Sequence, residues 1–191
     1  AVEEVAAGLC ELGIQPGDIV ALDSETRFEF YIADLGVQVC GAVAAALYTS
    51  CPPADHVKTL RACDPRAVFV ENPKALAALK SAAEPPLDTI WILLTGSDDE
   101  TETLDGLRAR GRRALDADPT LPAKLKERVH ADDFAILYLT SGATGEPKMG
   151  LVTHASIVAN VDMGREVVPI GPEDCSIAFL PSIGAAATVI S

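Results

Sequence analysis

The chain has 191 residues, of which 49% are hydrophobic and 23% are charged, a balance typical of a globular domain with a substantial core. Its 28 acidic and 15 basic residues give a formal net charge of −13, which argues against general binding to the polyanionic backbone of a nucleic acid. Any phosphate group that the chain binds must therefore be held locally, by a few cations and oriented backbone amides.

The elements are expected to alternate along the chain. In order, we expect a helix over 2–12, a strand over 19–22, a helix over 27–39, a strand over 42–47, a helix over 54–63, a strand over 67–70, a helix over 73–83, a strand over 89–94, a surface loop over 96–102, a helix over 104–117, a partly irregular segment over 121–130 and a strand over 134–139. The strands are continuous apolar runs, which suits strands covered on both faces. The sequence therefore predicts an α/β fold, with a mainly parallel sheet flanked by helices.

The apolar segments do not predict a membrane span. The longest candidate, residues 37–47, is interrupted by Gln38 and Gly41 and is too short to cross a bilayer. The start has no basic-then-apolar signal segment, so we expect a cytoplasmic protein, with peripheral membrane contact left open for a longer form. The chain begins without Met inside a helical pattern and ends in an apolar stretch, so we expect both ends to be cut.

Five cysteines are spread along the chain: Cys10, Cys40, Cys51, Cys63 and Cys175. No two have CxxC spacing, and no cysteines and histidines cluster at metal-ligand spacing, so we expect no metal site built by this chain. The odd count and the apolar neighbours of several of them predict reduced, mostly buried thiols, as in a cytosolic protein.

The segment that carries chemistry follows the last predicted strand directly and reads Thr-Ser-Gly-Ala-Thr-Gly-Glu-Pro-Lys over residues 140–148. Its glycines let the backbone turn and expose N–H groups, which form an anion-binding concavity. Hydroxyls and a lysine add the donors and the charge that a polyphosphate needs. The predicted phosphate-binding residues are Thr140, Ser141, Gly142, Thr144, Gly145 and Lys148.

This segment has two alternative interpretations. A nucleotide-binding loop of the G-x-x-x-x-G-K-[ST] type is a poor fit, because Pro147 replaces its second glycine and Met149 replaces its hydroxyl residue. The second alternative is a plain Ser/Thr/Gly turn between two strands. The combination of hydroxyls, glycines and a terminal lysine favours a phosphate loop of a different kind.

Residues 138–148 resemble the signature loop of the adenylate-forming superfamily: acyl-CoA synthetases, luciferases and the adenylation domains of peptide synthetases, whose sequences are close to YTSGTTGxPKG. The segment LGIQPGDIVA, residues 12–21, resembles an early strand region of that family, and residues 174–182 resemble a later one. Residues 47–50, LYTS, resemble the long-chain acyl branch. The resemblance thus covers nearly the whole chain.

The resemblance implies that residues 1–191 are an incomplete amino-terminal, AMP-binding domain, without the family's carboxy-terminal domain. It implies a two-step reaction, in which a long-chain fatty acid attacks ATP to give an acyl-adenylate and pyrophosphate, and the thiol of coenzyme A then takes the acyl group. Lys148 would be the catalytic cation, and Mg²⁺ would share the charge of the pyrophosphate. The isolated chain is expected not to complete acyl-CoA synthesis.

Departures from the family pattern keep other functions open. Ala143 replaces a hydroxyl residue, a change that weakens phosphate binding by about 1 kcal/mol. Gly184 stands where the family commonly has a histidine close to the acyl carboxylate, so either the acyl site differs or this end of the chain has been altered. A non-catalytic module that acts as a binding or assembly partner is therefore the alternative. Self-association through the truncated face is a third possibility.

Several single residues outside the segment 140–148 also have both a functional and a structural interpretation. His154 follows the loop, and both a role near phosphate or substrate and a structural role at a helix start stay open. His56 and His130 have no partners at catalytic or ligand spacing, and we expect both at the surface. Trp91 is expected in the core, and the acidic residues 98–100 are expected to be solvated rather than to bind a metal.

Overall fold

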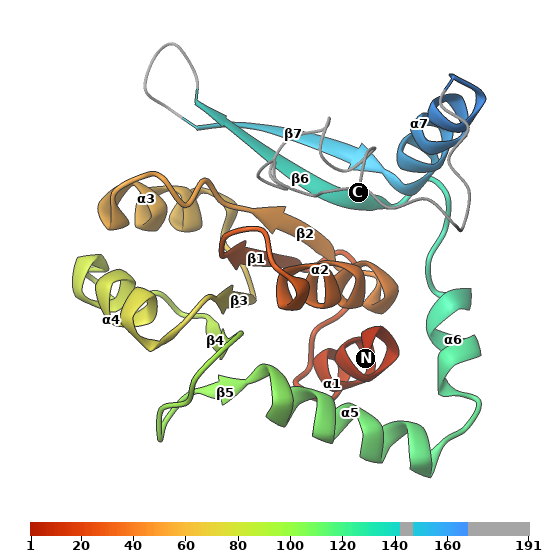
Figure 1. Ribbon diagram of the computed structural model, residues 1–191, viewed down its shortest axis with the longest axis horizontal. Helices are drawn as coiled ribbons and strands as arrows, with labels where there is room; N and C mark the ends of the chain where they lie inside the picture. Colours follow the sequence, from red (N-terminus) through yellow and green to blue (C-terminus); the bar gives the residue numbers. More distant parts are fainter. Residues whose placement is uncertain (142–146, 168–191) are drawn as a thin grey trace.

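A seven-stranded sheet with helices on both faces forms the part of the chain that the computed structural model describes, residues 1–141 and 147–167 (Figure 1). The strand order is β5-β4-β3-β1-β2-β6-β7, and every neighbouring pair is parallel except β6 and β7. The elements are α1 (Val2–Glu11), β1 (Ile19–Asp23), α2 (Phe28–Cys40), β2 (Val43–Ala46), α3 (Pro53–Cys63), β3 (Ala67–Val70), α4 (Pro73–Ala82), β4 (Ile90–Leu93), β5 (Glu102–Thr103), α5 (Leu104–Ala117), α6 (Leu121–Glu127), β6 (Phe134–Ser141), β7 (Pro147–Thr153) and α7 (His154–Val167).

Two apolar cores lie on opposite faces of the sheet. Val20 and Leu22 of β1 pack in the core formed with α1, α2, α5 and α6. Ala21, between them, belongs to the core formed with α3 and α4. Because successive side chains of a strand point to opposite faces, a strand buried on both sides must be apolar at every position. This confirms the predicted α/β fold with a mainly parallel sheet.

Local signals set the ends of the helices. Asn72 caps α4 by accepting a hydrogen bond from the Ala75 N–H at 3.0 Å, and Thr103 caps α5 by accepting from the Gly106 N–H at 3.0 Å. Gly41 ends α2 in the left-handed conformation, with φ of 87°, which a glycine adopts without steric cost.

The structure differs from the sequence prediction at β5 and at β7. β5 is a two-residue strand that starts at the end of the predicted 96–102 loop and pairs with β4. The segment predicted as partly irregular, residues 121–130, agrees with the structure, since the short helix α6 ends at Glu127 and residues 128–130 follow it. β7 was not predicted, because Lys148, Met149 and Gly150 interrupt its apolar character.

The sheet topology defines one edge where loops converge. β1 lies between β2 and β3 in the sheet. The chain therefore passes from β1 to β2 on one side of β1 and then crosses over to β3 on the other side. Ligands of open α/β sheets bind beyond the carboxyl ends of strands at such a reversal. β6 runs parallel to β2, with Ala44 opposite Ile136, so the segment that follows β6 leaves from this same carboxyl edge. Figure 1 shows this edge, where β6 ends and β7 begins on the same side of the sheet as α3.

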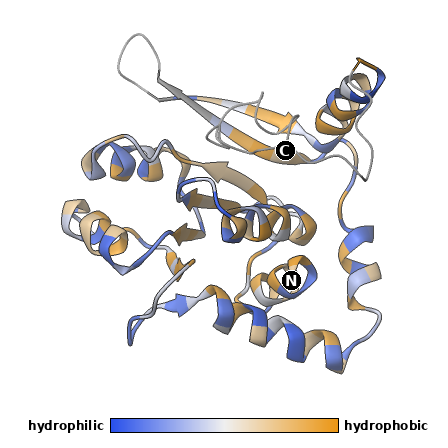
Figure 2. Cartoon of the chain, in the orientation of Figure 1, coloured by the Kyte–Doolittle hydropathy of each residue, from blue (hydrophilic) through white to orange (hydrophobic). Residues whose placement is uncertain are grey.

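Apolar side chains lie exposed on β7 and α7. Figure 2 shows apolar positions along both elements, away from the two helix-covered faces. The exposed fractions are 50% for Leu151, 57% for Met163 and 81% for Val167. Among the described residues, no helix has both the length and the apolar character needed to cross a bilayer.

Candidate functional site: the carboxyl edge of the sheet

The segment predicted to bind phosphate connects the antiparallel strands β6 and β7. Thr140 lies opposite Lys148 in the register of the hairpin, and Ser141 lies opposite Pro147. The structure therefore brings Thr140, Ser141 and Lys148 together at one end of the hairpin. The other three predicted residues lie outside the described residues: Gly142, Thr144 and Gly145.

The position of this hairpin end determines what it can do chemically. It lies at the carboxyl edge of the sheet, and Lys148 is exposed there. An ammonium group can donate charge-assisted hydrogen bonds to a polyphosphate. The plain-turn alternative was right about topology, since the segment does join two strands. That topology is compatible with a phosphate loop, and binding by the six predicted residues stays a prediction.

His154 lies at the other end of the hairpin. It begins α7 directly after Thr153, which is opposite Phe134 at the start of β6. Thr153 Oγ1 accepts a hydrogen bond from the Ser156 N–H at 3.3 Å and so caps α7. Residues 149–153 of the extended strand β7 separate His154 from Lys148, so closeness in sequence does not place this histidine beside the loop.

The His154 ring instead lines a cavity of about 340 Å³ between α2, α6 and α7. Its Nε2 atom is buried and has no hydrogen-bond partner among the described residues. Burial lowers the pKa of His154, because a buried imidazolium loses its hydration. A neutral ring at the amino edge of the sheet favours the structural alternative.

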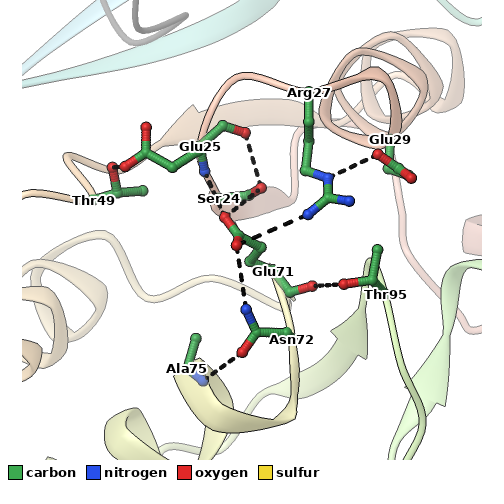
Figure 3. Close-up of polar contacts among 9 residues, drawn as sticks. All are labelled: Ser24, Glu25, Arg27, Glu29, Thr49, Glu71, Asn72, Ala75 and Thr95. Atoms are coloured by element: carbon green, nitrogen blue, oxygen red, sulfur yellow. Dashed lines mark hydrogen bonds and ion pairs between the residues drawn. The ribbon is translucent and has the colours of Figure 1, made fainter.

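A polar network that the sequence did not reveal ties the loops of the carboxyl edge together (Figure 3). The Glu71 carboxylate, just after β3, accepts from the Glu25 N–H at 3.0 Å and the Ser24 hydroxyl at 3.4 Å. It also accepts from the Asn72 amide at 3.2 Å, and the Arg27 guanidinium lies 3.9 Å away. We call Ser24, Glu25, Arg27, Glu71 and Asn72 the Glu71 network.

Two neighbouring contacts extend the Glu71 network. The Thr95 hydroxyl, after β4, donates to the Glu71 carbonyl at 2.7 Å, and the Thr49 hydroxyl, after β2, donates to the Glu25 carboxylate. The network thus links the carboxyl ends of β1, β2, β3 and β4. Because the Glu71 side chain already has these hydrogen-bond partners, the network fixes the loops at the carboxyl edge of the sheet and does not offer an open ligand site.

Arg27 is held from a second side. Its Nε atom lies 2.8 Å from the Glu29 carboxylate. This hydrogen bond raises the pKa of Arg27 and lowers that of Glu29, since each charge stabilises the other.

His56 contradicts its prediction as a surface residue. Its side chain is buried, with Nδ1 3.2 Å from the Asp23 carboxylate and Nε2 2.6 Å from the Tyr48 carbonyl. The reason is helical spacing, because His56, Leu60 and Cys63 follow one another on the buried face of α3. With an acceptor at each ring nitrogen, the imidazolium is favoured, and the Asp23 hydrogen bond is the main cause that raises the pKa of His56.

The His56–Asp23 pair predicts a pH-dependent stability. A raised folded-state pKa means that the stabilisation is complete below the unfolded-state value of about 6.5 and is lost as pH rises through the folded-state pKa. His56→Gln should lower the free energy of unfolding by about 1–3 kcal/mol at pH 5.5, and by less at pH 8.5. Urea unfolding at a series of pH values measures this difference, with exposed His130→Gln as the control. A difference that is constant or grows with pH would contradict the assignment.

The burial of the other side chains considered above agrees with the sequence predictions. His130 is exposed, and Trp91 is half-buried against the α3–α4 core. Residues 98–100 are exposed, and Asp98 accepts hydrogen bonds from its own loop, from the Glu100 N–H at 2.7 Å and the Thr101 hydroxyl at 3.0 Å.

Two CoA ligases are similar in sequence to this chain. The chain is 30% identical over 198 residues to the long-chain-fatty-acid–CoA ligase FadD15 of Mycobacterium bovis, matching 100% of this chain and 31% of FadD15. It is also 30% identical over 167 residues to 4-coumarate–CoA ligase of Pinus taeda, matching 83% of this chain and 27% of that enzyme. The chain thus spans less than a third of the length of these relatives.

Solved structures share the fold. The inhibitor-bound amino-terminal domain of FACL13 from Mycobacterium tuberculosis matches with a TM-score of 0.77 and 25% identity, over 99% of this chain and 44% of that one. ATP-bound MatB from Rhodopseudomonas palustris matches with a TM-score of 0.76 and 23% identity, over 99% of this chain and 35% of that one. The family model described as AMP-binding enzyme matches residues 1–189. The chain therefore belongs to the AMP-binding, adenylate-forming enzyme family.

Proposed function

We propose that this chain supplies the phosphate-binding hairpin of an enzyme that activates a carboxylic acid with ATP and transfers the acyl group to coenzyme A. The observation that supports it most is the hairpin register, with Lys148 opposite Thr140 at the carboxyl edge of the sheet. Membership of the AMP-binding family and the fold shared with ATP-bound MatB agree with a nucleotide substrate.

The residues of the hairpin would act on the leaving pyrophosphate. The carboxylate oxygen of the acid attacks the α-phosphorus, the bond to the β-phosphate oxygen breaks, and negative charge grows on the leaving group. Lys148 would neutralise part of that charge, while Thr140, Ser141 and Thr144 donate hydrogen bonds to phosphate oxygens. Gly142 and Gly145 would let the backbone N–H groups approach. When bound to the phosphates, Mg²⁺ supplies further charge neutralisation.

A long-chain fatty acid is the proposed acid. The LYTS segment at residues 47–50 and the relationship to FadD15 support it. The pine 4-coumarate–CoA ligase is equally identical over a shorter stretch, so an aromatic acid is the competing substrate class. The distinction depends on residues that line the acyl site.

A non-catalytic module is the second candidate function. Ala143 in the phosphate loop and Gly184 in place of the family's usual histidine favour it. Such a module would keep the fold and the Glu71 network but would not form an acyl-adenylate. Its role would be that of a binding or assembly partner.

Activity of a longer protein separates these candidates. A protein that contains this chain and the sequence that follows it in the gene is assayed for pyrophosphate release with ATP, Mg²⁺ and a panel of acids. Release that depends on a long-chain fatty acid, with acyl-CoA formed when coenzyme A is added, supports the proposal. Preference for coumarate would reassign the acid, and no release with any acid would favour the non-catalytic module.

The exposed apolar residues of β7 and α7 predict self-association of the 191-residue chain. Leu151, Val158 and Met163 are each at least half exposed, and burying them against a second copy is favourable. Sedimentation velocity should show dimers or larger species that decrease in Leu151→Glu. A monomer at every concentration would contradict this expectation.

A further inference from the structure

Two cysteines meet where α1 and α2 end. Cys10 lies in the last turn of α1, and Cys40 is the last residue of α2. Their Sγ atoms are 3.3 Å apart. Cys40 is completely buried, whereas Cys10 is half-buried. A small reagent that reaches Cys10 therefore meets a second sulfur directly behind it.

The backbone around both residues is fixed by hydrogen bonds. The Cys10 carbonyl accepts from the Gly13 N–H at 2.9 Å, in the turn that ends α1. The Gly41 carbonyl, next to Cys40, accepts from the Gly17 N–H at 2.8 Å, which ties the same turn region to the end of α2. Figure 1 shows α1 and α2 packed side by side. The contact between the two sulfurs is thus built into the helix packing.

The surroundings make Cys10 the more reactive of the two. The hydrogen bond from the Cys40 thiol lowers the pKa of Cys10, and the positive charge of Arg128 adds to this effect. The same contact, together with burial, raises the pKa of Cys40. Cys63 differs, since burial raises its pKa to about 11 and its thiol donates to the Leu60 carbonyl at 3.6 Å. Only a thiolate attacks an oxidant efficiently.

We propose that Cys10 and Cys40 are an oxidation site of this chain, which closes to a disulfide when it meets a peroxide. The Cys10 thiolate attacks one oxygen of hydrogen peroxide, the O–O bond breaks, and hydroxide leaves, so that Cys10 becomes a sulfenic acid. The Cys40 sulfur then attacks the Cys10 sulfur, the S–O bond breaks, and the leaving hydroxide takes the thiol proton as water. In total, two thiols lose two electrons and the peroxide is reduced to two waters.

The geometry suits this closure. A disulfide bond is about 2.05 Å long, so the sulfur atoms need to approach by only about 1.3 Å from their present contact. The bond would close a loop from residue 10 to residue 40 that contains β1 and α2. Because such a loop restricts the unfolded chain, oxidation should raise Tm by on the order of 5 °C.

The test oxidises the purified chain with hydrogen peroxide, alkylates the remaining thiols and maps peptides without reduction. The expected result is a chain lighter by two hydrogens, a peptide pair linked through Cys10 and Cys40, and a higher Tm that a thiol reductant reverses. The proposal is overturned if Cys10 and Cys40 are both still alkylated after treatment, or if Cys51 of two chains forms the only disulfide.

Matched variants locate the chemistry. Cys63→Ala removes another buried thiol and should keep both the linked peptides and the Tm increase. Cys40→Ala should lose both and leave Cys10 as a sulfenic acid that dimedone traps. Dimedone labelling of Cys51 in place of Cys10 would also overturn the proposal. Since the wild-type chain alone gives a decisive result, poor folding of a variant does not remove the test.

Discussion

Replacing Lys148 with alanine is expected to lower the rate of acyl-adenylate formation by roughly 10²–10³-fold in a protein that contains this chain and the rest of the enzyme. Under the proposed function, the ammonium group of Lys148 would stabilise the charge that grows on the leaving pyrophosphate, and alanine would leave that charge without this cationic partner. Acid-dependent exchange of labelled pyrophosphate into ATP measures this step.

The control for this experiment is another exposed lysine. Lys124 of α6 pairs with Asp118 at 2.6 Å, away from the hairpin, and Lys124→Ala should leave the exchange rate unchanged. Lys148→Arg keeps the charge and should recover part of the activity. If Lys148→Ala retains activity within about twofold of wild type, the residue has no part in the chemical step.

Gly111→Ala is expected to destabilise the fold by about 3 kcal/mol. In an exposed helix this change would stabilise by up to about 1 kcal/mol, because alanine favours helix over glycine. At Gly111 of α5, however, an added Cβ would lie 1.8 Å from the Glu4 carbonyl oxygen of α1. Backbone must move to relieve that contact, so the sign of the effect is reversed. Denaturation in urea gives the change in the free energy of unfolding.

A matched substitution on the same helix separates packing from helix propensity. Arg113 is exposed, and Arg113→Ala should change the free energy of unfolding by less than about 0.5 kcal/mol. The salt bridges of Glu4 with Arg108 and Arg112, each at 2.9 Å, show the same close approach of α1 and α5. A Gly111→Ala chain at least as stable as wild type would contradict this close packing of α5 against α1.

The fold was largely predictable because its sheet is buried on both faces. Continuous apolar runs such as residues 67–70 alternate along the chain with predicted helices. This combination indicates a parallel sheet that helices cover on both faces. Turn and cap residues then set the ends, as Asn72 does for α4 and Gly41 for α2. β5 was missed because a two-residue edge strand made of Glu and Thr has no apolar pattern.

Contacts between distant segments were the part that sequence could not give. The Glu71 network joins residues that are 46 positions apart, and no spacing rule links Glu25 to Glu71. His56 is a different case, since its position in register with Leu60 and Cys63 was visible. A single polar residue on an apolar face was interpreted as exposed, although Asp23 stabilises it from a neighbouring strand.

The candidate site was predicted from the residue types of one short segment rather than from hydrophobic periodicity. Hydroxyls, glycines and a lysine identified residues 140–148, and the structure adds that Lys148 lies opposite Thr140 at the carboxyl edge. The role of His154 stayed open because the sequence did not predict that the segment between Lys148 and His154 is an extended strand. β7 carries His154 to the opposite edge.

Binding of magnesium pyrophosphate and of magnesium ATP to the 191-residue chain, measured by titration calorimetry, tests the phosphate-binding hairpin most directly. Saturable binding by wild type is predicted, with affinity reduced roughly 10–100-fold in Lys148→Ala, since a hydrogen bond to a charged group contributes about 1.5–3 kcal/mol. Lys124→Ala should bind as wild type does. Equal affinity of wild type and Lys148→Ala, or no binding by wild type at millimolar ligand, would contradict the assignment of this hairpin as the phosphate-binding element.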